Sequence, residues 1–236
     1  MGKIVVFFSF LVSAFVVGLG LPDARAALSS KVTYFTDEFS NYTEGVCFED
    51  GSAFGPWTVV FDGYGCVSTL YLGSDHLLAL QPKTAMIPTE THSALTVGPR
   101  FSGPFNYDIL YFNQAQLRTG SVPNPWEVGW VVWDYTDSNH FYYFIAKPNG
   151  WELGKRDPTY PGGQRNLISG TSVVFPIGQW NFVRVEQVKN KLTVYANGTK
   201  IVSYVDKLNP YLSGQIGIYS EDALVYVTSV KVSSKK

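Results

Sequence analysis

The strongest structural signal is the stretch WNFVRVEQVKNKLTVYANGTKIVSYV at residues 180–205. Trp180 and Phe182 occupy alternate positions, which is typical of a β-strand because its successive side chains point to opposite faces. The pair Asn197-Gly198 separates two alternating runs. Both residues accept the positive φ angles of a type I′ turn, so the stretch predicts a β-hairpin.

Short runs of the same kind, separated by turn signals, continue through the chain from Val32 onward. Their Val, Thr, Ile and aromatic residues favour strands, and the Gly, Pro and Asn residues between them favour turns. No window carries a long helical stripe. About a dozen strands at this spacing predict an all-β fold, a two-sheet antiparallel β-sandwich of the jelly-roll type. The predicted strands include 57–61, 68–72, 77–81, 109–117, 127–135, 141–147, 151–156, 180–187, 191–196, 200–205, 215–219 and 223–232.

The composition excludes several classes of protein. The 236 residues include 18 Lys and Arg against 19 Asp and Glu, and only 16% of them are charged. A disordered chain combines low hydrophobicity with high net charge, and a nucleic-acid binder carries a basic footprint. The sequence therefore predicts a folded protein that has no nucleic-acid partner.

The first 26 residues have the features of a secretory signal peptide. Lys3 precedes an apolar run at 4–17, and Ala24-Arg25-Ala26 places small residues at the two positions that signal peptidase reads. We predict cleavage after Ala26 and a single domain over residues 27–236, secreted or held at the cell surface. An uncleaved membrane anchor is the alternative, because the run approaches the lower length limit of a span. No later segment is long and apolar enough to cross a bilayer.

The chain has two cysteines, Cys47 and Cys66. Export to an oxidising compartment makes a disulfide between them the expected state, and two free buried thiols are the alternative. A zinc site is not expected, because no Cys-x-x-Cys motif or His pair at ligand spacing accompanies them.

Three motifs carry a resemblance to a known superfamily. The stretch at 178–198, followed by GQIGIY at 214–219, resembles the second half of concanavalin A-like lectin/glucanase domains, among them laminin G-like modules and the 3-keto-disaccharide hydrolase-like domain. The residues DEFS at 37–40 are similar to the opening strand of these domains. The resemblance covers residues 33–232 and implies the sandwich fold. It does not imply one activity, because the superfamily holds lectins, glycosidases, lyases and adhesion modules.

The catalytic patterns of enzymes in this superfamily are not found in the sequence. Its retaining glycosidases carry a triplet such as Glu-x-Asp-x-x-Glu on one strand, whereas the best candidate strand begins with Glu127 and continues with apolar residues. The Gln-x-His motif of the related alginate lyases is not found either. We therefore predict no catalytic residue. An enzyme would need carboxylates from different strands, such as Glu127 with Glu152 or Asp157, to converge.

Residues 114–165 contain the candidate binding residues. They include four of the six tryptophans, interleaved with amide, carboxylate and guanidinium side chains. Aromatic rings stack on the apolar face of a sugar, and such polar groups bond its hydroxyls. Both faces of the strands in this region are apolar enough to be covered, so either face can be the core face. We predict that a groove for a polysaccharide or glycan is lined by Arg118, Trp133, Tyr142, Glu152 and Arg156; the alternative is that most of these aromatic residues are sandwich core.

Calcium is a separate prediction, which the resemblance implies for a site near the paired chain ends. Asp37 or Glu38 would supply oxygen ligands, and Asp222 would reach the ion from the last loop. Such hard oxygen ligands suit Ca²⁺. Related sequences usually carry an acidic residue near Thr228, and this departure weighs against the site.

These observations predict a secreted carbohydrate-binding or surface-interaction module without catalytic machinery. One alternative is a glycoside-directed hydrolase or lyase that acts on an extracellular polysaccharide. Another is a structural subunit of an extracellular matrix or filament, which would self-associate through exposed sheet edges. Two carboxylates within about 9.5 Å in one cleft would favour the enzyme, and an open apolar edge would favour the filament.

Overall fold

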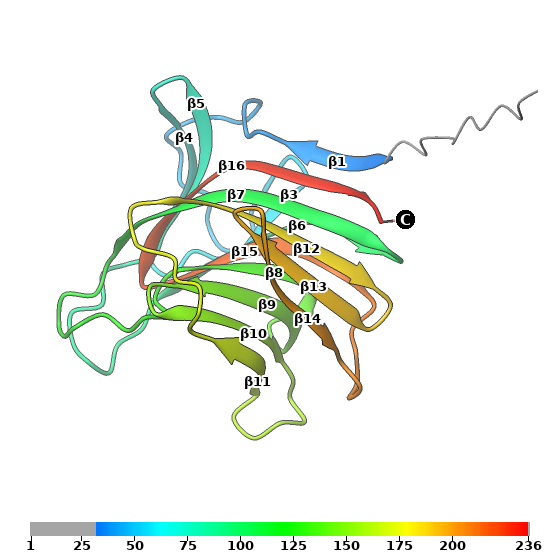
Figure 1. The fold of residues 1–236 in the computed structure, drawn as a ribbon. Coiled ribbons are helices and arrows are strands. Elements are labelled where there is room, and N and C mark those ends of the chain that lie inside the picture. The colour runs from blue at the N-terminus through cyan, green and yellow to red at the C-terminus, as the bar shows by residue number, and fades with distance from the viewer. Residues whose placement is uncertain (1–31, 236) are drawn as a thin grey trace, which may run out of the picture. The chain divides into compact units, whose positions relative to one another are not determined.

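The computed structural model describes residues 32–235, which form sixteen β-strands and no helix (Figure 1). The strands form two antiparallel sheets of eight strands each, which confirms the predicted β-sandwich. The signal peptide predicted at residues 1–26 lies outside the described residues. Within residues 32–235, no helix could span a membrane.

Sheet A carries the chain ends. Its central strand is β16, which pairs with β7 along one side and with β1 and β5 along different parts of the other. Asp37 of β1 lies opposite Val230 of β16, so the first and the last of the sixteen strands pair with each other. The strands of sheet A are β1 (Thr33–Asp37), β4 (Cys66–Leu72), β5 (Asp75–Gln81), β7 (Phe105–Gln116), β12 (Trp180–Val188), β13 (Lys191–Ala196), β14 (Thr199–Val205) and β16 (Ala223–Ser234).

Sheet B packs against sheet A and contains the strands in which the binding residues were predicted. Its order is β11-β10-β9-β8-β15-β6-β3-β2. The order places β8 and β9 in the interior of the sheet, each with a neighbouring strand on both sides. The strands of sheet B are β2 (Ala53–Phe54), β3 (Trp57–Phe61), β6 (Ser93–Ser102), β8 (Gly129–Asp137), β9 (His140–Lys147), β10 (Gly150–Arg156), β11 (Gln164–Gly170) and β15 (Ser213–Glu221).

The hairpin predicted at Asn197-Gly198 joins β13 to β14. The φ angles of Asn197 and Gly198 are 50° and 80°. Both values lie in the left-handed region that a type I′ turn requires, and Asn and Gly adopt this region at low energetic cost. The local sequence therefore fixes the register of these two strands.

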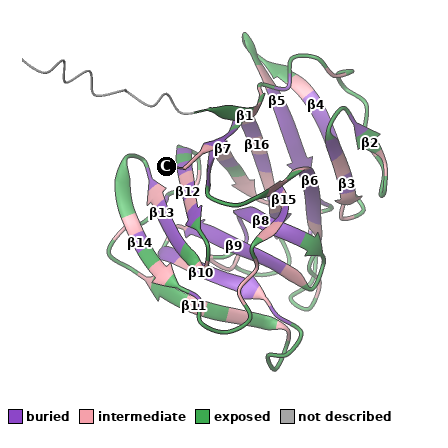
Figure 2. Ribbon diagram, turned by 90° about the vertical axis from the view of Figure 1, so that its right-hand side faces the viewer, coloured by how far each residue is buried: buried purple, intermediate pink, exposed green. Residues whose placement is uncertain are grey.

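One set of alternating side chains fills the space between the sheets. Val183 and Val185 of β12 belong to the same buried cluster as Phe144 of β9 and Leu153 of β10. Figure 2 shows buried stretches along the central strands of both sheets, with exposed residues towards β11 and β14. Removal of this apolar surface from water is the main favourable contribution to folding.

The opposite set of side chains on sheet B is also covered. Trp130 and Val132 of β8 form a second buried cluster with Tyr143 and Ile145 of β9. Ile177, from the segment between β11 and β12, packs against this cluster. The two central strands therefore bury both of their faces, as the apolar character of both faces predicts.

The sequence prediction missed β2, β6 and β11. Strand β6 contains Gly98 and Pro99, two residues that ordinarily interrupt a strand. Strand β11 is at the edge of sheet B, where it is half exposed and carries few apolar residues. Strand β2 has only two residues. Each of these strands is stabilised by hydrogen bonds to its neighbouring strands, and its own sequence has no apolar alternation that would predict it.

Cys47 and Cys66 form the predicted disulfide. Cys66 begins β4, and Cys47 lies in the segment between β1 and β2. The bond therefore fastens a segment without long strands to the edge of sheet A. Because the two cysteines are 19 residues apart, the disulfide restricts the unfolded chain by closing a loop of moderate length.

Replacement of both cysteines by serine is expected to lower the free energy of unfolding by about 3 kcal/mol, mainly through the greater entropy of the unfolded chain. Urea unfolding of the wild type and of the Cys47→Ser, Cys66→Ser double variant measures this difference. Equal unfolding midpoints and slopes for the two proteins would contradict the expectation.

Candidate functional site

Two of the five predicted binding residues are in the core. Trp133 and Tyr142 are fully buried in the cluster between the sheets. Their rings stack with centroids 5.6 Å apart, and the Tyr142 hydroxyl donates a 2.7 Å hydrogen bond to buried Asp206. The structure thus places both residues inside the sandwich and not in a groove, which corrects the prediction for this pair.

Arg118 is buried beside two carboxylates. Its Nε donates to Glu127 at 2.7 Å and its Nη2 to Asp222 at 2.8 Å. The guanidinium also donates to the carbonyl oxygens of Ile87 and Glu90. These bonds tie two long connections to the turn that precedes β16, so the contacts of Arg118 are structural.

Glu152 and Arg156 lie on the outer face of sheet B, the face turned away from sheet A. Glu152 accepts hydrogen bonds from the Tyr143 hydroxyl at 3.0 Å and from Lys147 at 3.3 Å. Gln164 donates to the same hydroxyl at 3.2 Å. Arg156 has no ion-pair partner within residues 32–235. Of the five predicted residues, only these two share an accessible face.

A pocket of about 250 Å³ opens on this outer face. Trp130 forms part of its wall, with ring centroids 4.7 Å from Tyr219 and 5.0 Å from Tyr143. The wall also contains the unpaired guanidinium of Arg156 and the amide of Gln164. The lining residues come from seven strands and one turn, and they are Phe61, Ser93, Leu95, Trp130, Ser138, Phe141, Arg156, Gln164, Tyr219 and Glu221.

A neighbouring hollow of about 290 Å³ extends this pocket. The two share Phe61 and Ser93 in their linings and therefore adjoin, and we name the pair the sheet B groove. At its far end the ring of Tyr64 is 85% exposed and stands edge-on to His92, with centroids 5.9 Å apart. Asp50 and Asp62 line the same end. An exposed aromatic ring with carboxylates beside it suits a polyhydroxylated ligand.

The groove residues missed in the sequence analysis occupy the opposite face of the same strands. Trp130 precedes buried Trp133 by an odd number of residues, and Tyr143 follows buried Tyr142 directly. Side chains at odd separations in a strand point to opposite faces. The alternation of side chains along these strands therefore indicates which residues share a face. It does not indicate which face is the core, because both faces are apolar.

Glu221 lines the sheet B groove, and its surroundings shift the pKa of its carboxyl group. It ends β15 and accepts a 2.7 Å hydrogen bond from the Tyr219 hydroxyl. Burial, reinforced by the negative charges of Asp222 and Glu127, raises the pKa of Glu221 to about 7. A carboxyl that exchanges its proton near neutral pH can donate or accept hydrogen bonds and can serve as a general acid or base.

The raised pKa of Glu221 predicts a pH-dependent effect of the Glu221→Gln substitution on stability. The folded-state pKa of about 7 exceeds the ordinary value of 4.5, so the contribution of this group is fully present below pH 4.5 and is lost as the pH rises through 7. At pH 8 the variant is expected to have a free energy of unfolding higher than the wild type by on the order of 2 kcal/mol. At pH 4.5 the two proteins are expected to agree.

Urea unfolding at the two pH values measures this effect, and Glu38→Gln, at an exposed carboxyl, is the matched control. A difference between Glu221→Gln and wild type that is the same at pH 8 and pH 4.5 would contradict the prediction.

The carboxylates that would have to converge in an enzyme, Glu127 with Glu152 or Asp157, lie far apart. Glu152 is opposite Ile145, which is opposite Trp130. Glu127 therefore lies three residues and two strands away from Glu152, roughly 14 Å by ordinary strand spacings. Asp157 is buried beyond the end of β10, where it pairs with neighbouring cations. The structure brings none of these carboxylates to one site.

The residues predicted for calcium are also separated. Asp37 of β1 is opposite Val230 of β16, whereas Asp222 precedes the other end of β16, roughly 25 Å away by ordinary strand rise. Asp37 accepts a 2.8 Å hydrogen bond from the Trp57 indole, and Asp222 is paired with Arg118. Within the described residues, no group of three or more His, Cys, Asp or Glu side chains could hold a metal ion. These residues do not fit calcium.

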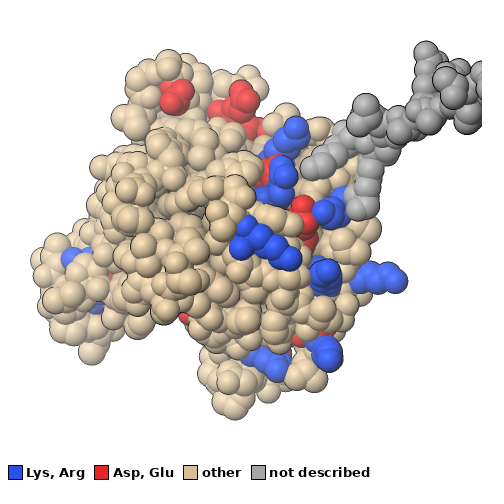
Figure 3. All heavy atoms as spheres, viewed as in Figure 1, with Lys and Arg blue, Asp and Glu red and all other residues tan. Residues whose placement is uncertain are grey.

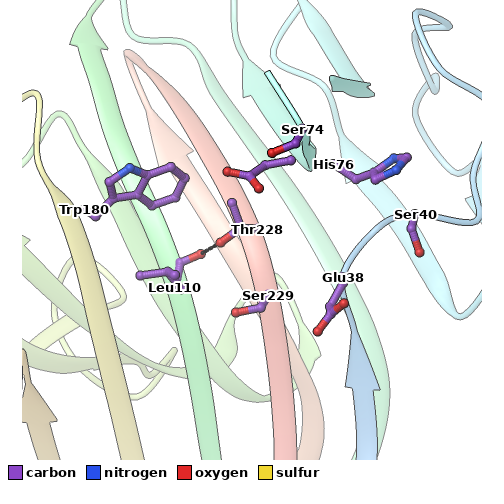
Figure 4. A pocket seen from close by; sticks show the side chains of 9 residues that line it. Glu38, Ser40, Ser74, His76, Leu110, Trp180, Thr228 and Ser229 are labelled. Carbon is purple, nitrogen blue, oxygen red and sulfur yellow. Dashed lines mark hydrogen bonds between the residues drawn. The ribbon is translucent and has the colours of Figure 1, made fainter. Parts of the chain in front are cut away.

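A separate hollow of about 460 Å³ lies on the outer face of sheet A, where β1 and β5 diverge along β16 (Figure 4). Trp180 borders one side, and Glu38, Ser40 and His76 lie on the other. Trp180 is the one Phe, Tyr or Trp side chain in its lining, whereas four such residues line the 250 Å³ pocket of sheet B. We take the sheet B groove as the candidate site because it combines several aromatic faces with converging polar groups.

Comparison with protein families identifies the chain. The model of the 3-keto-α-glucoside-1,2-lyase-like domain matches residues 101–233, which is more than half of the sequence. The chain belongs to this family. The match includes all of the strands from β7 to β15, and thus Trp130, Arg156 and Glu221 of the groove. Among curated proteins, no sequence matches the chain.

Solved structures with a similar fold include several carbohydrate-related proteins. The carbohydrate-binding module CBM66 of Bacillus subtilis matches with a TM-score of 0.55 at 13% identity and covers 76% of this chain and 96% of its own. A GH16 protein of a Bacteroides ovatus mixed-linkage glucan locus, with bound product, gives 0.53 at 11% identity and covers 84% and 99%. Domain 4 of a Geobacillus stearothermophilus GH43 arabinanase, in complex with arabinotriose, gives 0.52 at 13% identity and covers 86% and 93%. These matches confirm the concanavalin A-like jelly-roll fold.

Proposed function

We propose that this member of the 3-keto-α-glucoside-1,2-lyase-like family is a secreted, non-catalytic module that binds a polysaccharide or glycan in the sheet B groove. The observation that carries the proposal is the pair of adjoining hollows on the outer face of sheet B. It combines aromatic walls with an unpaired guanidinium, an amide and a carboxyl.

The chemistry of the groove suits a sugar. The partly exposed rings of Phe61 and Tyr219 can offer apolar surface to the C–H face of a pyranose or furanose. Trp130 and Phe141 line the same pocket but are each only 5% exposed. Arg156 donates without accepting, and Gln164 does both, so together they can bond the vicinal hydroxyls of one ring. The network from Gln164 through Tyr143 to Glu152 holds this amide in position, so less side-chain entropy is lost on binding.

Two further observations support export and a glycan partner. Residues 1–26 read as a secretory leader, and a disulfide such as Cys47–Cys66 persists in oxidising compartments. CBM66 is a carbohydrate-binding module, and the arabinanase domain was solved with arabinotriose. The structural likeness to these two proteins makes plant, algal and microbial polysaccharides the first ligands to test.

Arg156→Gln is expected to weaken binding of the glycan selected from such a panel about tenfold, because the variant loses hydrogen bonds from a charged donor. Arg165→Gln is the matched control: Arg165 is opposite Lys155, on the inward-facing set of β10, and it pairs with Asp157. Isothermal titration of the two variants and the wild type measures the effect. Equal weakening by both variants, or by neither, would exclude the sheet B groove as the site, and no binding across the panel would exclude the function.

The raised pKa of Glu221 favours one other function, which is a lyase that cleaves 3-keto-α-glucosides, as the name of the family suggests. In a 3-keto-α-glucoside the ketone acidifies the proton on carbon 2. The Glu221 carboxylate would take this proton, a carbon 1–carbon 2 double bond would form, and the glycosidic oxygen would leave with its bonding electrons. Incubation of the wild type with such a glucoside tests this function. Release of the aglycone that Glu221→Gln abolishes, with binding retained, would favour the lyase, and no release would exclude it.

A further inference from the structure

Basic side chains gather on the outer face of sheet A. Figure 3 shows them over the region where β12, β13 and β14 lie, close to the C-terminal end of β16. The strand register explains this grouping, because Lys231, Arg184 and Lys200 lie in one row across the sheet. Lys231 of β16 is opposite Asp108 of β7, Asp108 is opposite Arg184 of β12, and Tyr195 of β13 lies between Arg184 and Lys200 of β14.

The two carboxylates among these basic side chains, Asp108 and Glu186, are already bonded. Asp108 accepts two hydrogen bonds from Arg184, at 2.6 and 2.7 Å. Glu186 pairs with Lys235 at 2.6 Å. Within residues 32–235, the three remaining lysines of the face, which are Lys191, Lys200 and Lys231, have no ion-pair partner. This part of the face thus keeps a positive charge although the whole chain has a formal net charge of −1.

Two hollows follow the same strands. One, of about 280 Å³, is lined by Phe182, Arg184, Glu186, Tyr195 and Gly198. The other, of about 170 Å³, shares Glu186 and Tyr195 with the first and contains Lys191, Lys200 and Lys235. Because they share two lining residues, the hollows adjoin, and we name the pair the basic groove.

The basic groove also has aromatic surface. The Phe182 side chain is 39% exposed, and the Arg184 guanidinium lies 6.0 Å from the centre of its ring. Tyr195 stands between the two hollows. Exposed rings flanked by unpaired ammonium groups can accept the C–H face of a sugar and, beside it, the anionic group that the sugar carries.

We propose that the basic groove is a second binding site, specific for an acidic polysaccharide whose rings carry carboxylate or sulfate groups. The site is on the opposite sheet from the sheet B groove and shares no residue with it. The proposal therefore goes beyond the proposed function and stands or fails independently of it. Binding of an acidic chain here would hold the module on a charged matrix while the sheet B groove stays open.

The spread of the charges favours a polysaccharide over a nucleic acid or a membrane. From Lys231 to Lys200 the row crosses five strands, roughly 19 Å by ordinary strand spacing. Only three unpaired lysines cover this span, which is too few for the multiple phosphate contacts of a nucleic acid or for a polybasic membrane patch. A flexible polysaccharide with one charge on each sugar ring can place these charges beside the lysines. The sugar rings between the charged contacts can then pack against Phe182 and Tyr195.

Binding of paired charged and neutral polymers to the whole protein tests the proposal. The probes are polygalacturonate and its fully methyl-esterified form, and dextran sulfate and dextran. We expect binding of at least one charged polymer, no binding of its neutral counterpart, and at least about a fivefold loss of affinity between 50 and 300 mM salt. The first pair reports carboxylate recognition and the second reports sulfate recognition.

The double variant Lys191→Gln, Lys200→Gln is expected to weaken this binding at least about fivefold. The double variant Lys83→Gln, Arg100→Gln removes two exposed cations elsewhere and is the matched control. Arg156→Gln changes only the sheet B groove, so it distinguishes binding there from binding in the basic groove. Both of these variants are expected to bind the charged polymer as the wild type does, and unchanged thermal unfolding verifies that each variant is folded. The proposal is overturned by unaltered binding in the first variant, by equal binding of the neutral polymers, or by tighter binding to duplex DNA or phosphatidylserine vesicles.

Discussion

The alternation of side chains along β8, β9 and β10 is the constraint on which the rest of the structure depends. One set, with Trp133 and Tyr142, fills the space between the sheets, and the other, with Trp130 and Tyr143, faces outward. A shift of one residue in register would exchange the two sets and would expose the core. Pairing with both neighbouring strands and burial on both faces therefore fix the position of every outward side chain, and so the shape of the sheet B groove.

A buried ionic cluster couples this framework to the groove. Arg118 pairs with both Glu127 and Asp222, and Asp222 is adjacent to Glu221 in the chain. Adjacent residues point in different directions here, so one carboxylate completes the ion pair while the other lines the groove. Removal of the Arg118 charge would leave two buried carboxylates without a counter-charge, which is strongly destabilising. The same cluster sets the electrostatic environment in which Glu221 titrates.

The fold was predictable from the sequence, whereas the site was predictable only in part. Local alternation places the strands at 57–61 and 191–196 as observed, and Asn197-Gly198 sets its hairpin. Strand β6 was missed because its pairing overrides Gly98 and Pro99. Glu152 and Arg156 were found in the right strand, but Trp133 was preferred to Trp130 because both faces of β8 are apolar. Nothing local marks Arg118 as buried, since Asp222 is 104 residues away in the chain and Glu127, only nine residues away, is one of several carboxylates within its reach.

The most direct test of the central claim is the crystal structure of the protein with an oligosaccharide cut from the neutral glycan that it binds. The account predicts sugar rings against Phe61 and Tyr219, with hydroxyls bonded by Arg156 and Gln164. Sugar density beside Trp180 on sheet A, with the sheet B groove unchanged, would contradict it.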